Sequence, residues 1–224
     1  MNIPQKYQPQ LITKEGYFKW SLDFFSDPNV IQSPYIDITL QLEVTNAYNL
    51  YKEHKLESST FFSFLLWNLV QTIKNHPDFR MRLVDDQWYI LDNPSVITPV
   101  AIGGKERFNE LYLEDVSNIS YQEFVKEYNR QLLNIRNGKG KRENPQIFTL
   151  SMMIGNLPNL QFTGLNLHWR QSNIAAAPWF YFGKRYWQND KLYIPFAVKL
   201  HHSCSDPFVF NLLMEDFNKR FYDN

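Results

Sequence analysis

The feature that most constrains the fold is a long apolar run near the end of the chain, LYIPFAVKLHH, which leads directly into SCSDPF. Its density of aliphatic and aromatic residues predicts a long strand, in which side chains alternate between two faces. One face holds Leu192, Ile194, Phe196, Val198, Leu200 and His202, and the other holds Tyr193, Pro195, Ala197, Lys199 and His201. The first set is more apolar, so the alternation predicts that His202, and not His201, continues the buried row.

Immediately after the histidines, Asp206 and Pro207 predict the start of a helix. Aspartate is a favoured N-cap, and proline is favoured at the first helical position. Proline also pushes the preceding residue into the extended conformation that an N-cap uses. An amphipathic segment from Pro207 to Phe221 follows, so a strand, a short turn and a helix are expected in this order.

The cluster of His201, His202, Cys204 and Asp206 admits several chemistries. Neighbouring strand residues point apart, so the two histidines are poorly placed to bind one metal ion, and no acid or cysteine has the spacing to complete a metal site. No Gly-x-Ser-x-Gly elbow is present, and Cys204 is predicted to be a small buried residue. The ring of His202 either makes a local hydrogen bond or serves as a base.

The rest of the chain predicts alternating helices and strands without a repeat or a linker. Strands are expected over 36–44, 95–102, 160–167, 179–187 and 191–202, with a hairpin over 79–92 that turns at Asp85 and Asp86. Helices are expected over 46–55 with Thr45 as cap, 59–74, 120–135 and 207–221, and a loop is expected over 136–144. Consecutive strands joined as hairpins favour an α+β fold: a two-layer sandwich with a mixed, largely antiparallel sheet covered by helices, in a single domain over 1–224.

Composition excludes several functional classes. The 23 basic and 23 acidic residues of the 224-residue chain cancel, which removes the electrostatic argument for nucleic acid or an anionic membrane. No stretch approaches the roughly 18 apolar residues of a membrane span. One cysteine permits no internal disulfide, and the first residues show no signal-peptide pattern, so a cytoplasmic protein is expected.

Four motifs in order resemble the chloramphenicol acetyltransferase family. They are NHPDFRMRL, NLPNLQFTGLNL, AAPWFYFGKRYW and the HHSCSD segment, which resembles the family's His-His-x-x-x-Asp-Gly. The similarity extends from near Phe18 to Phe221. The resemblance implies a compact α+β fold that assembles as a homotrimer with active sites between subunits, with a role in antibiotic resistance.

The resemblance also implies a reaction and a set of site residues. Acetyl-CoA would be the acyl donor and a small-molecule alcohol, chloramphenicol among them, the acceptor, with no metal and no covalent acyl-enzyme. His202 would be the general base and Asp206 the aspartate that holds the shape of the site. Gly155, Leu167, Tyr181 and Lys184 would contribute to substrate binding.

The chain departs from the family pattern at every auxiliary position. The serine that donates to the tetrahedral intermediate falls on Gly155, and the threonine that helps to hold a transition-state water falls on Tyr181. The arginine that pairs with the aspartate falls on Trp20, and the glycine after the aspartate is Pro207. An acceptor-contacting aromatic residue falls on Asp27.

Three functional hypotheses follow. The first is an acetyl-CoA-dependent O-acetyltransferase, which the histidine, the aspartate and the extent of the resemblance favour. The second is a catalytically weakened relative that binds small molecules, which the changed auxiliary residues favour. The third, a dihydrolipoyl transacylase core, is disfavoured because the chain is short and contains no lipoyl or peripheral-binding segment.

Overall fold

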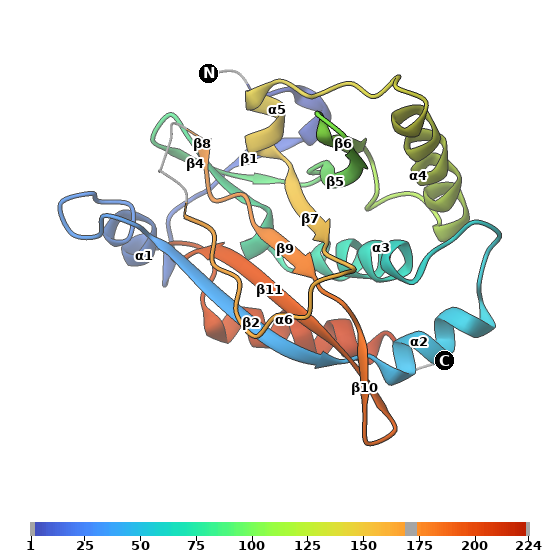
Figure 1. Cartoon of the computed structure of the whole chain (residues 1–224). Coiled ribbons are helices and arrows are strands. Elements are labelled where there is room, and N and C mark those ends of the chain that lie inside the picture. Colours follow the sequence, from blue (N-terminus) through green and yellow to red (C-terminus); the bar gives the residue numbers. More distant parts are fainter. Residues whose placement is uncertain (1–2, 169–173, 223–224) are drawn as a thin grey trace.

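The strands of the computed structural model, which describes residues 3–168 and 174–222, form two sheets (Figure 1). The larger sheet has the order β10-β11-β9-β7-β5-β6, and β2 pairs with β11. Its strands are β2 (Tyr35–Glu43), β5 (Val96–Gly103), β6 (Arg107–Leu113), β7 (Met152–Asn156), β9 (Trp179–Phe182), β10 (Tyr186–Gln188) and β11 (Lys191–His201). Strands β5, β7 and β9 run parallel, and the remaining pairs are antiparallel.

The smaller sheet has the order β1-β4-β3-β8, and each of its pairs is antiparallel. Its strands are β1 (Pro9–Leu11), β3 (Met81–Val84), β4 (Gln87–Leu91) and β8 (Ile174–Ala175). The α-helices are α1 (Phe18–Phe24), α2 (Thr45–Glu53), α3 (Phe61–Ile73), α4 (Tyr121–Arg136), α5 (Pro145–Leu150) and α6 (Pro207–Lys219), with 3₁₀ turns at Gln5–Tyr7 and Pro77–Arg80. Mixed sheets covered by helices confirm the predicted α+β class.

The main core lies between the larger sheet and helices α2, α3, α4 and α6. Phe180, Phe182 and Phe196 point from the sheet into this core and are fully buried. Helix α3 is buried on most sides, and α6 packs against it (Figure 1). Because strand residues alternate, the neighbouring side chains of β9 and β11 point to the opposite face. We call this the Tyr181 face, and its members are Gly155, Trp179, Tyr181, Ala197 and Lys199.

Local signals account for most element boundaries. Thr60 and Ser63 form a capping box at the start of α3, and Ser120 and Glu123 form one at the start of α4. The predicted turn at Asp85 and Asp86 is confirmed, with φ of 46° and 63°, as a two-residue hairpin requires.

The predicted cap at Thr45 is wrong. This residue is already inside α2, whose N-cap is Val44. The Thr45 hydroxyl instead donates to Glu43 Oε1, at 3.1 Å, and accepts from Leu192 N, at 2.9 Å. The side chain therefore fastens the helix to β11, and it is not available to cap the helix.

The predicted strand over 160–167 is also wrong, because this segment carries no regular structure. Leu160 turns back toward β9, since its carbonyl accepts from Lys184 N at 2.7 Å. Phe162 O accepts from Gln41 Nε2, so the segment crosses β2 as a connection. Strand β7 comes just before it and was not predicted, because its five residues lack alternation and read as a short apolar run.

Candidate active site

His201 is the buried member of the histidine pair, which corrects the prediction from strand alternation. Strand β11 ends at His201, whose side chain lies edge-on to the rings of Tyr35 and Trp88. Its Nδ1 accepts from Ser203 N at 3.3 Å. Burial, with a smaller contribution from His202, lowers the pKa of His201 to about 3. This ring is therefore neutral and structural.

His202 follows the strand and is half-buried, and one face of its ring packs against an aromatic side chain. Its backbone N–H donates to Pro34 O at 2.7 Å. Its ring stacks on Phe25, with centroids 4.1 Å apart and planes 16° apart, and Nδ1 is buried without a partner among the described residues. Phe25, which follows α1, belongs to an aromatic cluster with Trp20 and Phe24 of that helix. A partly accessible imidazole with a stacked face is available for proton transfer.

Asp206 is the predicted N-cap of α6. Its Oδ1 accepts from Phe208 N at 2.8 Å and from Val209 N at 3.0 Å. Within the described residues, no hydrogen bond or ion pair joins its carboxylate to His202 or to a basic side chain. Trp20, which stands where the resemblance expects an arginine, is about half exposed and stacks on Phe24. In this chain the carboxylate is therefore engaged by backbone N–H groups.

Gly155 and Tyr181 are brought together in the middle of the larger sheet. They are paired residues of the parallel strands β7 and β9. A Cβ atom placed on Gly155 would lie 2.4 Å from Cε1 of Tyr181, so the phenol ring occupies the space in which a side chain at 155 would stand. Burial raises the pKa of the Tyr181 hydroxyl. The phenol is consequently neutral near pH 7.

An aromatic pocket lies at the start of β9, with a volume of about 250 Å³. Tyr35, Phe148 and Trp179 supply its rings, and those of Phe148 and Trp179 meet edge to face at 5.7 Å. Lys199 reaches the same pocket from β11. Ala176, in the pocket wall, has φ of +71°, a conformation that non-glycine residues rarely adopt and that clusters at functional sites.

Lys199 is almost fully buried, which makes it unusual for a lysine. Its Nζ lies 3.1 Å from Asp37 Oδ2, across the β11–β2 pair, and 4.9 Å from the centroid of the Tyr35 ring. The ion pair compensates the burial of both charges. It also gives an otherwise apolar pocket one polar wall.

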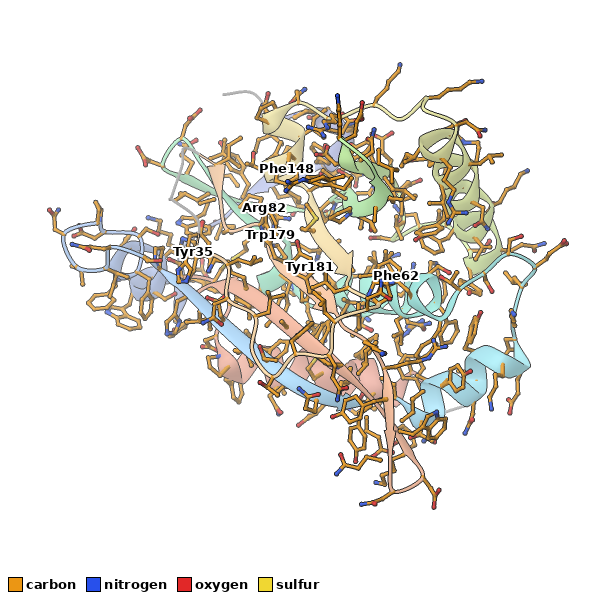
Figure 2. All side chains as sticks on the ribbon, in the orientation of Figure 1. Tyr35, Phe62, Arg82, Phe148, Trp179 and Tyr181 are labelled. Carbon is orange, nitrogen blue, oxygen red and sulfur yellow. The ribbon has the colours of Figure 1, made fainter. Side chains whose placement is uncertain are left out.

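A basic pocket lies just past the end of β9, with a volume of about 340 Å³. Asn156 and Gly183, each one residue beyond the Gly155 and Phe182 positions, border it together with Lys184 and Arg185. Phe61 and Phe62, from the first turn of α3, form its other side. In Figure 2, Tyr181 lies between Trp179 of the aromatic pocket and Phe62 of the basic pocket.

Arg82, which is fully buried on β3, ties the aromatic pocket to the smaller sheet. Its Nε donates to Leu150 O at 3.0 Å, at the end of α5, and Nη1 donates to Met81 O at 2.7 Å. Burial lowers its pKa to about 10. The guanidinium thus anchors α5, which carries Phe148.

A groove of about 510 Å³ lies between α3 and α6, on the helical side of the molecule, where His76 pairs with Asp216 and Arg220 donates to Asn68. His76 belongs to the NHPDFRMRL motif, and these side chains satisfy one another through hydrogen bonds. Within 3–168 and 174–222, no cluster of acidic, histidine or cysteine residues is placed to hold a metal ion, and no helix has the length and hydropathy to cross a membrane.

The structure therefore brings together part of the predicted site. Gly155 and Tyr181 meet, Lys184 borders the adjoining basic pocket, and Leu167 lies half-buried in the segment that crosses β2. His202 and Asp206 lie at the other end of β11. Sequence reasoning missed the ion pair of Lys199 with Asp37. A signal was present, because Lys199 interrupts a long apolar strand and needs a buried partner.

Comparisons of the sequence with known proteins identify one family. The model of the family described as "Chloramphenicol acetyltransferase" matches residues 18–218. The chain is 26% identical to a chloramphenicol acetyltransferase of Vibrio anguillarum over 173 residues, 76% of each chain. It is 26% identical to one of Proteus mirabilis over 187 residues, 81% of each. A solved chloramphenicol acetyltransferase structure shares the fold, with a TM-score of 0.76 at 20% identity over 94% of this chain and 98% of that one.

Proposed function

Because the chain belongs to the chloramphenicol acetyltransferase family, an acyltransferase family, we propose that it transfers an acetyl group from acetyl-CoA to a hydroxyl of a small molecule in the cytoplasm. Chloramphenicol, named in its relatives, is the first acceptor to test. One observation carries the proposal: the aromatic pocket, the Gly155–Tyr181 pair and the basic pocket follow one another along β9. Group transfer needs two substrates held with reacting atoms in contact, and two pockets at successive positions of one strand give each substrate a place close to the Gly155–Tyr181 pair.

The basic pocket suits the acyl donor. Coenzyme A carries several phosphate charges, and Lys184 and Arg185 both border the pocket with exposed side chains. The first turn of α3 forms the opposite side, and a helix N-terminus favours negative charge. The thioester end of the donor would then point toward Tyr181.

The aromatic pocket suits the acceptor. Tyr35, Phe148 and Trp179 offer flat apolar walls, and the Lys199–Asp37 pair supplies both a donor and an acceptor of hydrogen bonds. Pockets of this kind bind small molecules through apolar contact and use a few polar groups for orientation. Leu167 remains a proposed contact of the acceptor.

His202 is the proposed general base. Its imidazole takes the proton of the acceptor hydroxyl as the oxygen attacks the thioester carbonyl. The C–S bond then breaks, and the imidazolium returns the proton to the departing thiolate. Base catalysis of this kind contributes about 10²–10⁴-fold to rate.

The two halves of this site lie apart within one chain. Tyr181 pairs with Ala197, and His202 comes five residues later along β11. At about 3.3 Å per residue the separation is roughly 16 Å, more than the two side chains span when both stand perpendicular to the sheet. We therefore propose that a second copy supplies the histidine, in a homotrimer with sites between subunits.

The test is thiol release from acetyl-CoA in the presence of chloramphenicol and a panel of small alcohols. We expect turnover by the natural chain and a loss of about 10²–10⁴-fold in kcat for His202→Ala. His54→Ala, at an exposed histidine, is the control and is expected to retain full activity. Activity that survives in His202→Ala contradicts the assigned base.

A binding protein without turnover is the second candidate. The observation that favours it is the Tyr181 ring, which fills the position that a serine at 155 would use. Calorimetric binding of chloramphenicol or coenzyme A together with no thiol release from any alcohol would favour this function over the first.

A further inference from the structure

Gly155 is explained by the ring that crosses it. A glycine inside a strand weakens the strand and commonly marks a close approach by another group. Here that group is the Tyr181 side chain, whose Cε1, Cδ1 and Cζ atoms would lie 2.4, 2.6 and 3.2 Å from a Cβ at position 155. The backbone of Gly155 does not have the positive φ that favours glycine. Space for the phenol is therefore the reason for glycine, and the two residues form one unit.

The hydroxyl of this phenol has no hydrogen-bond partner among the described residues. Two tyrosine hydroxyls elsewhere on the larger sheet are engaged: Tyr186 donates to Gln41 at 3.0 Å and Tyr112 donates to Glu114 at 3.0 Å. Tyr181 is half-buried, and burial raises the pKa of its hydroxyl, so it stays protonated in neutral solution. A protonated phenol that is unpaired within the chain is a hydrogen-bond donor that can serve a substrate.

The donor stands on β9, on the same face of the sheet as Trp179 and Lys199 of the aromatic pocket, whereas the basic pocket adjoins the end of β9 from the side of α3. Trp179, two residues before Tyr181 on β9, lines the aromatic pocket, and Gly183, two residues after it, borders the basic pocket (Figure 2). Resting on the proposed function, we propose that the Tyr181 hydroxyl donates a hydrogen bond to the oxyanion of the tetrahedral intermediate, replacing a donor that the backbone of Gly155 cannot carry.

The step balances without any further reactant. The acceptor oxygen forms a bond to the thioester carbon, and the carbonyl π pair moves to the carbonyl oxygen, which becomes the oxyanion. The Tyr181 O–H donates to this oxygen and keeps its own proton. The electron pair on the oxyanion re-forms the carbonyl as the C–S bond breaks, and the thiolate receives the proton held by the imidazolium. A fixed donor to a developing oxyanion contributes about 10²–10³-fold to kcat.

The first variant is Tyr181→Phe, which keeps the ring over Gly155 and removes only the oxygen. We expect kcat to fall by about 10²–10³-fold while KM for acetyl-CoA stays close to that of the natural chain, because the bond forms only in the transition state. The matched control is Tyr186→Phe, which removes a hydroxyl outside the pockets and is expected to leave kcat unchanged. Thermal unfolding checks that both variants remain folded.

The second test exchanges the pair. Gly155→Ser alone is expected to lower activity, because its Cβ would overlap the ring. Tyr181→Thr alone is expected to lose as much kcat as Tyr181→Phe, because its shorter side chain withdraws the donor. The double variant has a serine donor and the space to hold it. Its kcat is expected to be at least about tenfold higher than the value calculated by multiplying the two single effects.

The outcomes separate this inference from the proposed function. Full kcat in Tyr181→Phe, in an enzyme that still depends on His202, overturns the role of the tyrosine and leaves the acetyltransferase standing. Additive effects in the double variant also overturn it, because the two positions would then not act as a unit. Absence of thiol release by the natural chain removes the proposed function, and this inference with it.

Discussion

The two faces of the larger sheet differ although the same strands build both. On the helix-covered face Phe180, Phe182 and Phe196 are fully buried in one continuous apolar core. On the Tyr181 face the alternate residues include the rings of Trp179 and Tyr181, a buried charge and a glycine, and Trp179 and Lys199 line the aromatic pocket. The helix-covered face therefore supplies most of the free energy that stabilises the fold. The Tyr181 face carries polar groups whose burial costs free energy and which are suited to binding or catalysis.

Truncation of adjacent residues on opposite faces of β9 is expected to give the largest difference between the two faces. Phe180→Ala is expected to lower the free energy of unfolding by about 3–5 kcal/mol, because it leaves a cavity in the core. Trp179→Ala removes a half-buried ring, so it is expected to cost less stability and to raise KM for the acceptor. Urea denaturation followed by circular dichroism measures the change in the free energy of unfolding, and thiol-release kinetics measure the change in KM. Equal losses of stability would contradict the division between the faces.

The buried ion pair tests the cost of polarity on the Tyr181 face. Lys199→Met leaves the mostly buried Asp37 without its partner and is expected to cost about 3 kcal/mol. The double variant Lys199→Met with Asp37→Leu removes both charges and is expected to regain most of that loss. Urea denaturation of the single and double variants supplies the comparison. If the double variant is no more stable than Lys199→Met alone, the ion pair makes a net contribution to the free energy of unfolding and does more than offset the burial of its two charges.

His201 predicts an acid-dependent loss of stability. In the folded chain burial lowers its pKa to about 3, whereas the unfolded chain binds a proton near its ordinary value of 6.5. Stability from this residue is thus complete above pH 6.5 and falls by about 1.4 kcal/mol per pH unit as the pH drops toward 3. Unfolding midpoints between pH 7 and pH 4 measure it. His201→Phe is expected to flatten this dependence, and His54→Gln, at an exposed site, is expected to leave it unchanged.

Asp206 gives the smallest expected effect. Asp206→Ala removes the cap of α6 and is expected to cost about 1 kcal/mol, similar to Ser120→Ala at the cap of α4. Asp206→Asn keeps a capping oxygen and is expected to retain nearly all stability and a kcat/KM close to that of the natural chain. Thermal unfolding and thiol release check both. A large kinetic loss in Asp206→Asn would show that the carboxylate has an ionic partner in the assembled protein.

Much of the fold was accessible from local patterns. The cap of α6 at Asp206, the turn at Asp85 and Asp86 and the long strand β11 each follow from a few adjacent residues, and the structure confirms them. The family, predicted from four motifs, is confirmed by a match over 18–218. Strand β7 was missed, and the segment 160–167 was misassigned, because both depend on long-range contacts with β9 and β2.

Residue identity and local spacing were enough to predict β11, α6 with its cap at Asp206, and the hairpin turn at Asp85 and Asp86. The tertiary structure alone decided which histidine is buried, because the strand ends at His201 and the alternation ends with it. The tertiary structure also explains the glycine at position 155. The phenol of Tyr181 comes from a strand 26 residues further along and fills the space beside it, and no local pattern encodes that contact.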